Sequence, residues 1–250
     1  MPSSSDPDDT QPDVSAPADP GAPADRSPAP RPAPDKPRGA RLRLPMLGRH
    51  PRDPPPQDRM KGISIAAFVQ WYATSGDPER LRAVIGRLRP EHQALLAPER
   101  PSAGIIASTW YPSALVHELL DGLTEGLSER ELDDLAERGE GAIMDATLHG
   151  THRLFFRMLV TPERYARYSQ ALWGRFFDSG RVESWVDGRT VSNRVSGWRG
   201  YHCFICKMNR EALRIIHQAM GEEVLGVDAG DCRAAGALSC VTHVRLAPRR

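Results

Sequence analysis

The prolines of this chain are distributed very unevenly, and this constrains what can fold. Sixteen of the 23 prolines lie in residues 1–59, a segment that contains no Phe, Trp or Tyr. Such a composition cannot bury enough apolar surface to offset the chain entropy that folding costs. We therefore predict a disordered Pro/Ala-rich tail over residues 1–59 and a single folded domain over residues 60–247, long enough to bury a sizeable core.

The charges of the tail are also segregated. Residues 1–25 carry six Asp and no basic residue, whereas residues 26–59 carry nine Arg or Lys and three Asp. The basic half could contact an acidic partner or nucleic acid, but a solvated linker is the more common meaning of this composition. The whole chain has 33 basic and 32 acidic residues, which gives no overall nucleic-acid footprint. A nucleic-acid partner is therefore not expected.

Several features point to the cytoplasm. No run approaches the roughly 20 apolar residues that span a bilayer, so no membrane span is expected. The first ten residues are acidic and lack the apolar stretch of a secretory signal. Four cysteines in 250 residues are too few for a disulfide scaffold. We expect a cytoplasmic protein in a reducing compartment.

The first two-thirds of the domain show helical periodicity. Ser128 and Glu131 form a capping box, and Thr161 followed by Pro162 is a second helix start. The Gly139–Gly141 segment is interpreted as a helix break, and the acidic residues between 129 and 140 as a solvated helix face. The predicted helices cover 62–75, 79–88, 90–96, 113–123, 129–139, 143–160 and 162–176.

After Gly180 the periodicity changes to alternation. Residues 181–186 and 190–198 alternate on either side of Asp187-Gly188, which indicates a hairpin. A helix over 206–220 follows, then strands over 222–228 and 238–246. The predicted fold class is α+β, with a helical N-terminal layer packed on a small antiparallel sheet and a strand–strand–helix–strand–strand C-terminal part.

All four cysteines, Cys203, Cys206, Cys232 and Cys240, fall in the last 48 residues. Thiolates favour zinc over calcium or magnesium. The spacing is not that of a zinc ribbon, so the residues alone leave metal binding and buried, unligated cysteines equally open. A redox role for the Cys203/Cys206 pair is a third and less favoured interpretation, which rests on the lowering of thiol pKa values at a helix start.

The spacing Cys206-x25-Cys232-x7-Cys240, with Gly236 inside the last interval and a Cys-x-His-x-Arg ending, resembles the C-terminal signature of the 4-vinyl reductase-type domain. Softer agreement comes from Tyr111-Pro112 and from the stretch between Trp173 and Gly180. The resemblance covers about residues 60–247. It implies a ligand-sensing fold related to heme-nitric-oxide-binding domains and to subunits of the TRAPP transport particle.

The resemblance also implies a structural zinc. Phenol-sensing members hold it with three cysteines, which correspond to Cys206, Cys232 and Cys240, and with a carboxylate. Here Ala229 stands at the carboxylate position, so the fourth ligand departs from the family pattern. The candidates for that place are Cys203, Asp228 and Asp231, with His202 and His243 less suited.

A ligand pocket between sheet and helices is the last implication of the resemblance. Trp185 matches the offset of the tryptophan that contacts the ligand in phenol sensors, although plain core packing on a strand is the slightly favoured interpretation. Arg157 stands where the family has a histidine, and His149 and His152 lie nearby on one helical face. A solvated or core pair is the common alternative for these histidines. Heme ligation is not favoured, because the propionate-binding motif is missing.

The sequence contains no nucleophile elbow, phosphate loop, dinucleotide fingerprint or zinc-protease motif, so no enzyme is predicted. The expected function is a module that senses an apolar or aromatic small molecule, carries a structural zinc, and acts through an unknown output protein, as a homodimer. The alternative is a non-catalytic homodimeric adaptor of the transport-particle type. A filled core would favour the adaptor, and a cavity of roughly several hundred Å³ lined with apolar residues and Trp185 would favour the sensor.

Overall fold

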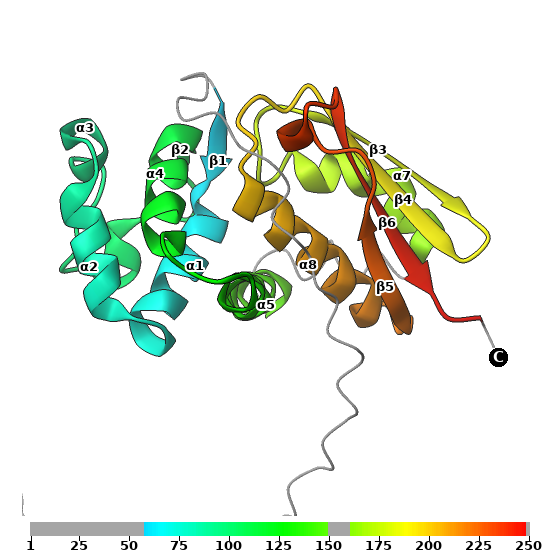
Figure 1. The fold of residues 1–250 in the computed structure, drawn as a ribbon, viewed down its shortest axis with the longest axis horizontal. Coiled ribbons are helices and arrows are strands. Elements are labelled where there is room, and N and C mark those ends of the chain that lie inside the picture. Colours follow the sequence, from blue (N-terminus) through cyan, green and yellow to red (C-terminus); the bar gives the residue numbers. More distant parts are fainter. Residues whose placement is uncertain (1–57, 150–160, 249–250) are drawn as a thin grey trace, which may run out of the picture. The chain divides into compact units, whose positions relative to one another are not determined.

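The computed structural model describes residues 58–149 and 161–248 (Figure 1). The predicted tail and residues 150–160 of the predicted 143–160 helix therefore lie outside the described residues, apart from Asp58 and Arg59. The N-terminal part is helical, apart from one short antiparallel strand pair. Its elements are β1 (Arg59–Lys61), α1 (Gly62–Ser75), α2 (Pro78–Arg87), α3 (Pro90–Gln93), the 3-10 helix η1 (Pro101–Gly104), β2 (Trp110–Pro112) and α4 (Ser113–Thr124).

Helix α5 (Glu129–His149) begins at the predicted capping box. The backbone N–H and hydroxyl of Ser128 both donate to the Glu131 carboxylate, at 2.7 and 2.6 Å. The predicted break at Gly139–Gly141 is wrong, because α5 runs through it without interruption. A Cβ on Gly139 would lie 2.5 Å from the Phe68 ring, so this glycine allows α1 and α5 to approach closely rather than ending the helix.

Helix α7 (Pro162–Trp173) begins where the sequence predicts, since the Thr161 hydroxyl accepts from the Arg164 N–H at 3.2 Å. Helix α8 (Cys203–Ala219) begins three residues before the predicted start, because the His202 ring caps it by accepting from the Phe204 N–H at 3.0 Å. The Lys207 side chain of α8 is fully buried, and its ammonium lies 2.6 Å from the Asp133 carboxylate of α5.

Four strands form an antiparallel sheet in the order β3-β4-β6-β5. Strands β3 (Arg181–Asp187) and β4 (Thr190–Ser196) are joined by the predicted hairpin, in which Gly188 adopts a positive φ of 54° that favours glycine. Strand β5 (Val224–Ala229) follows α8, and the 3-10 helix η2 (Arg233–Ala235) leads to β6 (Ser239–Leu246) in the centre of the sheet.

One face of the sheet is covered by α7 and α8 (Figure 1). Val191 and Val244 of neighbouring strands point to this face and are completely buried, where they pack with Ile216 of α8. The predicted fold class is confirmed: a helical N-terminal layer precedes a small antiparallel sheet with strand–strand–helix–strand–strand order. None of the helices in the described ranges is long and apolar enough to cross a membrane.

Gly139 and Gly141 allow a matched test of the α1–α5 contact. We expect Gly139→Ala to destabilise the fold by about 1–3 kcal/mol, because the added methyl meets the buried Phe68 ring. Gly141→Ala should stabilise it by up to about 1 kcal/mol, because a Cβ there meets nothing within 4 Å and alanine favours helix. Urea unfolding of both variants checks this, and equal effects of the two substitutions would contradict the close contact.

Candidate functional site: an apolar cavity beside a cysteine cluster

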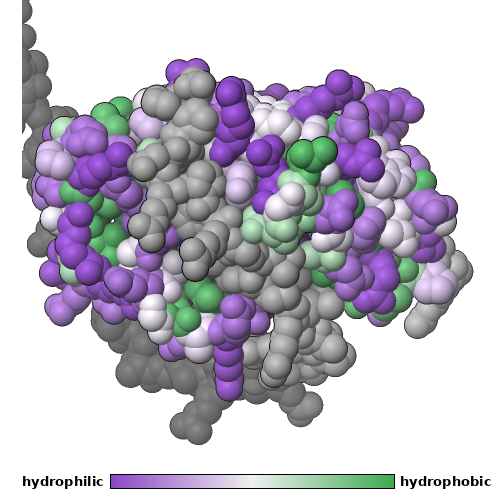
Figure 2. Space-filling view, turned by 45° about the horizontal axis from the view of Figure 1, so that its top comes forward, coloured by the Kyte–Doolittle hydropathy of each residue, from purple (hydrophilic) through white to green (hydrophobic). Residues whose placement is uncertain are grey.

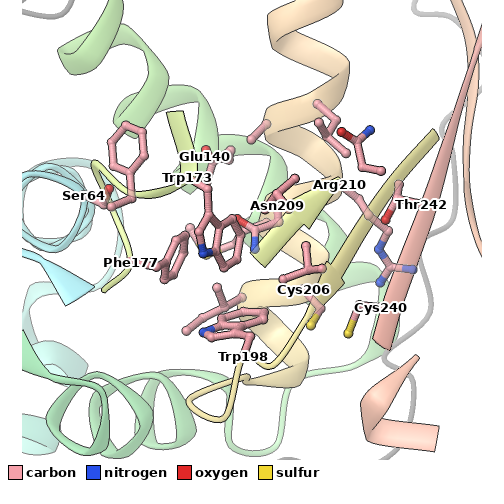
Figure 3. Close-up of a pocket in the computed structure, with 18 of the residues that line it drawn as sticks. Ser64, Glu140, Trp173, Phe177, Trp198, Cys206, Asn209, Arg210, Cys240 and Thr242 are labelled. Atoms are coloured by element: carbon pink, nitrogen blue, oxygen red, sulfur yellow. The ribbon is translucent and has the colours of Figure 1, made fainter. Parts of the chain in front are cut away.

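A cavity of about 180 Å³ lies among α1, α5, α7, α8 and the inner face of the sheet. Its walls are predominantly apolar and come from two hydrophobic clusters, one containing Phe68 and Phe204 and the other containing Tyr165 and Ile216. Side chains from α8 and from strands β4 and β6 reach it together (Figure 3). A closed apolar cavity of about 150 Å³ accommodates benzene in another protein, so this volume suits a single small ring.

Aromatic side chains form one wall of the cavity. Trp173 and Phe177 stack with ring centroids 4.0 Å apart, and Trp198 packs edge-on against both at 5.0 and 5.2 Å. The Trp173 indole N–H donates to the Ser179 carbonyl at 2.7 Å, which fixes the orientation of its ring. The three rings therefore present a pre-organised aromatic surface to the cavity.

Glu140 contributes a carboxyl group to the same cavity, so this part of the predicted solvated acidic face is wrong. Its side chain is buried, and no hydrogen bond or ion pair within the described residues involves its carboxyl group. Burial, followed by the negative charge of Glu211, raises the pKa of Glu140 to about 8. At neutral pH the group is therefore mainly the uncharged acid.

Asn193 on β4 supplies a second polar group to the lining. Its side-chain oxygen accepts from the hydroxyls of Tyr165 at 2.8 Å and Ser184 at 2.6 Å, which settles how the amide is oriented. The amide nitrogen is buried and has no hydrogen-bond partner in the described structure. A ligand with an acceptor would satisfy it.

The structure brings together three of the predicted metal-ligating residues. The thiol of Cys206 forms hydrogen bonds with both Cys232 and Cys240, which raise its pKa, while the same contacts lower the pKa values of Cys232 and Cys240. Cys206 and Cys240 lie close to one another at the edge of the cavity (Figure 3). Cys203 is buried, and burial is the main reason why its pKa is raised. The charge of the nearby Cys232 raises it further.

The fourth-ligand candidates lie differently. The Asp228 carboxylate is 2.6 Å from the Arg245 guanidinium on the neighbouring strand, so it is already paired. Asp231 and Arg210 line the cavity together with the cysteines. Among the described side chains, no group of three or more His, Cys, Asp or Glu is arranged as a metal centre. The donor types suit zinc, and metal binding stays a prediction.

Of the predicted pocket residues, only Trp185 has a side chain that the structure describes, and it does not reach the cavity. Trp185 lies on β3 with 39% of its surface exposed, beneath the Arg194 guanidinium at 5.3 Å, and it is not part of the lining. His149 is the last residue of α5, and its side chain and His152 lie outside the described residues. Their predicted contact with a ligand stays untested.

Sequence reasoning missed the residues that do line the cavity. The alternation Val182, Ser184, Val186 already places Trp185 on the opposite face of β3, which was a usable signal. Trp173 and Trp198 carried no comparable signal, because they meet only through the tertiary fold. Glu140 was concealed in a run of acidic residues, although apolar Ile143 and Met144 follow at helical spacing.

Comparisons with known proteins show the fold. The sequence matches no family model and no curated protein. Among solved structures, it is similar to an H-NOX protein from S. oneidensis in the Fe(II)NO ligation state, with a TM-score of 0.54 and 12% identity over 76% of this chain and 100% of that one. It is also similar to an Fe(II) unliganded H-NOX protein from K. algicida, with a TM-score of 0.55 and 11% identity over 76% of this chain and 98% of that one. The expected relation in fold to heme-nitric-oxide-binding domains is therefore confirmed.

The cavity does not fit a heme. Its volume of about 180 Å³ lies below the roughly 300 Å³ at which pockets for larger ligands begin. No histidine of the described ranges lines it, so none of these side chains is placed to bind a heme iron there. The described residues therefore share the fold of H-NOX proteins without presenting a heme-sized cavity or a histidine that lines it.

The raised pKa of Glu140 predicts a pH dependence of stability. In the folded chain Glu140 keeps its proton up to about pH 8, whereas a glutamate with the ordinary pKa of 4.5 loses it much earlier. The folded state therefore binds more protons than the unfolded state between pH 5 and 8, and the free energy of unfolding falls as the pH rises through this range. Glu140→Gln should reduce this fall in the free energy of unfolding by roughly 2–4 kcal/mol. Urea unfolding at several pH values measures it, with Glu137→Gln on the exposed face of α5 as control. The prediction fails if both variants keep the wild-type slope.

Proposed function

We propose that this chain is a small-molecule sensor domain of the 4-vinyl reductase type, which binds a small, largely apolar ring compound. The observation that carries the proposal is the cavity itself: an aromatic-walled space that holds the buried Glu140 carboxyl and the Asn193 amide nitrogen, the latter without a hydrogen-bond partner in the described structure. Buried polar groups are nearly always paired in native proteins, so the Asn193 amide favours a missing ligand, and the Glu140 carboxyl offers that ligand a second polar contact. The fold shared with H-NOX proteins supports the same class.

A structural zinc belongs to this proposal. Cys206, Cys232 and Cys240 would hold it, because their thiols already contact one another and thiolates are preferred zinc ligands. The metal would attach the start of α8 to the loop and strand that carry the other two cysteines. Its contribution would be to stability rather than catalysis, since a thiolate-rich closed shell leaves no open position.

The signalling output is proposed to pass through another protein, with the domain as a homodimer. A filled core would favour the adaptor alternative, and the core instead has an apolar cavity. At about 180 Å³ this cavity is smaller than the several hundred Å³ expected of a sensor, and Trp185 does not line it, so it supports a sensor only for a ligand the size of a single ring. The face in Figure 2 carries hydrophobic side chains in small patches separated by hydrophilic ones, rather than as one broad apolar area. Large hydrophobic residues exposed on the described surface are Leu95, Ile106, Trp185, Leu225 and Leu238.

Ligand binding is tested with the full chain and single-ring compounds such as toluene, phenol and benzyl alcohol. We expect at least one to raise the melting temperature and to give a saturable calorimetric isotherm. Ala212→Leu places a larger side chain in the cavity wall and should weaken binding about tenfold or more. Ala219→Leu, at an exposed position of the same helix, should leave it unchanged. No binding by any compound would contradict the sensor proposal.

Zinc is tested by mass spectrometry of metal content in full-length protein purified without a histidine tag. We expect one zinc per chain in the wild type, and its loss together with a lowered melting temperature in Cys232→Ser. Cys203→Ser separates the fourth ligand from the other three: retention of zinc would remove Cys203 from the set. Absence of metal from freshly reduced wild-type protein that has not met a chelator would overturn the zinc proposal.

A further inference from the structure

Glu140 is the one buried carboxyl group in the cavity lining, and the described residues show no hydrogen bond or ion pair for it. The other acidic residue of the lining, Asp231, is on the exposed loop after β5, where water can solvate it. Leaving a carboxyl without a partner in an apolar interior costs free energy. The group is therefore best explained by something that occupies the cavity.

The surroundings of Glu140 favour a positively charged occupant. Glu211 on α8 adds negative potential at Glu140, although it also pairs with Arg214. The stacked rings of Trp173 and Phe177, with Trp198 edge-on to both, form a wall of the kind that attracts organic cations through their π-faces. Aromatic faces are a common recognition device for ammonium groups, and Glu140 lines the same cavity as these rings.

Arg210 is the cation of the cavity lining, and it lies beside the cysteines rather than beside Glu140. Burial lowers the pKa of its guanidinium, whereas the acidic groups of Cys206, Cys232, Asp133 and Cys240 act in the opposite direction. Figure 3 shows Glu140 with Trp173 in the middle of the view and Arg210 with Cys206 and Cys240 to the right. Helix α7 contributes Tyr165, a phenol whose burial raises its pKa and keeps it uncharged. Helix α1 contributes the uncharged Ser64.

We propose that the ligand of this cavity is a small ring compound with a protonated amine, whose ammonium group pairs with Glu140 against the aromatic wall. This inference rests on the proposed sensor function and specifies its ligand class. Without ligand the carboxyl group keeps its proton. When the cation binds, that proton leaves to solvent and the carboxylate pairs with the ammonium, so binding releases up to one proton and no other bond changes.

The proton release gives the inference a measurable signature. With a pKa of about 8 for Glu140, affinity for a cation should increase about tenfold between pH 6 and 7 and should level off above pH 8. A neutral ring compound should show no such increase. The direction is opposite to that of an anionic ligand, which would bind more weakly as Glu140 ionises.

Calorimetric titration of the full chain with benzylammonium chloride tests this, with benzyl alcohol as the neutral probe of similar size. We expect benzylammonium to bind more tightly at pH 7.5, to gain affinity with pH, and to release protons in buffers of different ionisation enthalpy. Glu140→Gln should weaken benzylammonium about tenfold and abolish the proton release, with little effect on benzyl alcohol. Glu137→Gln, on the exposed side of α5, should behave as wild type.

The outcomes separate this inference from the proposed function. Binding of benzyl alcohol without binding of benzylammonium would overturn the cation while leaving the ligand cavity in place. Binding of neither compound, nor of the other ring compounds, would overturn both. If Glu140→Gln fails to fold, the pH profile and proton release of the wild type still decide the question, because a pH-independent benzylammonium affinity contradicts pairing with Glu140.

Discussion

The buried Lys207 ammonium of α8 and its carboxylate partners on α5 form the polar contact on which the packing of these two central helices depends. Lys207 is fully buried, lies 2.6 Å from Asp133, and also reaches Glu129 at 3.4 Å. A buried cation is tolerated only when opposite charges meet it with good geometry, so the register between α5 and α8 is narrowly defined. Because α8 also packs on β5 and β6, the same contact relates the helical layer to the sheet.

The cavity follows from how α5 is held between its neighbours. Gly139 brings the helix close to Phe68 of α1, while Lys207 holds it against α8. The next residue after Gly139, Glu140, lines the cavity together with Trp173, Phe177 and Trp198. The cavity therefore lies directly beside a point where α5 is closely packed, which helps to keep its walls in place.

The sequence predicted local features well and long-range ones poorly. The Ser128 and Thr161 caps and the hairpin at Gly188 depend on residues close together in the chain, and all three are present. The cysteine spacing correctly placed three thiols near one another, although they come from three segments. The reason for a glycine at position 139 is its contact with the ring of Phe68, 71 positions earlier in the chain, so the periodicity of α5 alone could not show that the helix continues there. The aromatic wall likewise forms only through tertiary contacts, which periodicity does not reveal.

The unbroken length of α5 has a mechanical consequence. At 1.5 Å per residue, its 21 residues form a rod about 30 Å long, with a fixed cap at Ser128 and the cavity group Glu140 near its middle. A break at Gly139 would have acted as a joint and absorbed any local displacement. Without that joint, a tilt imposed at Glu140 would be carried along the rod to its capped end at Ser128 rather than absorbed in the middle of the helix.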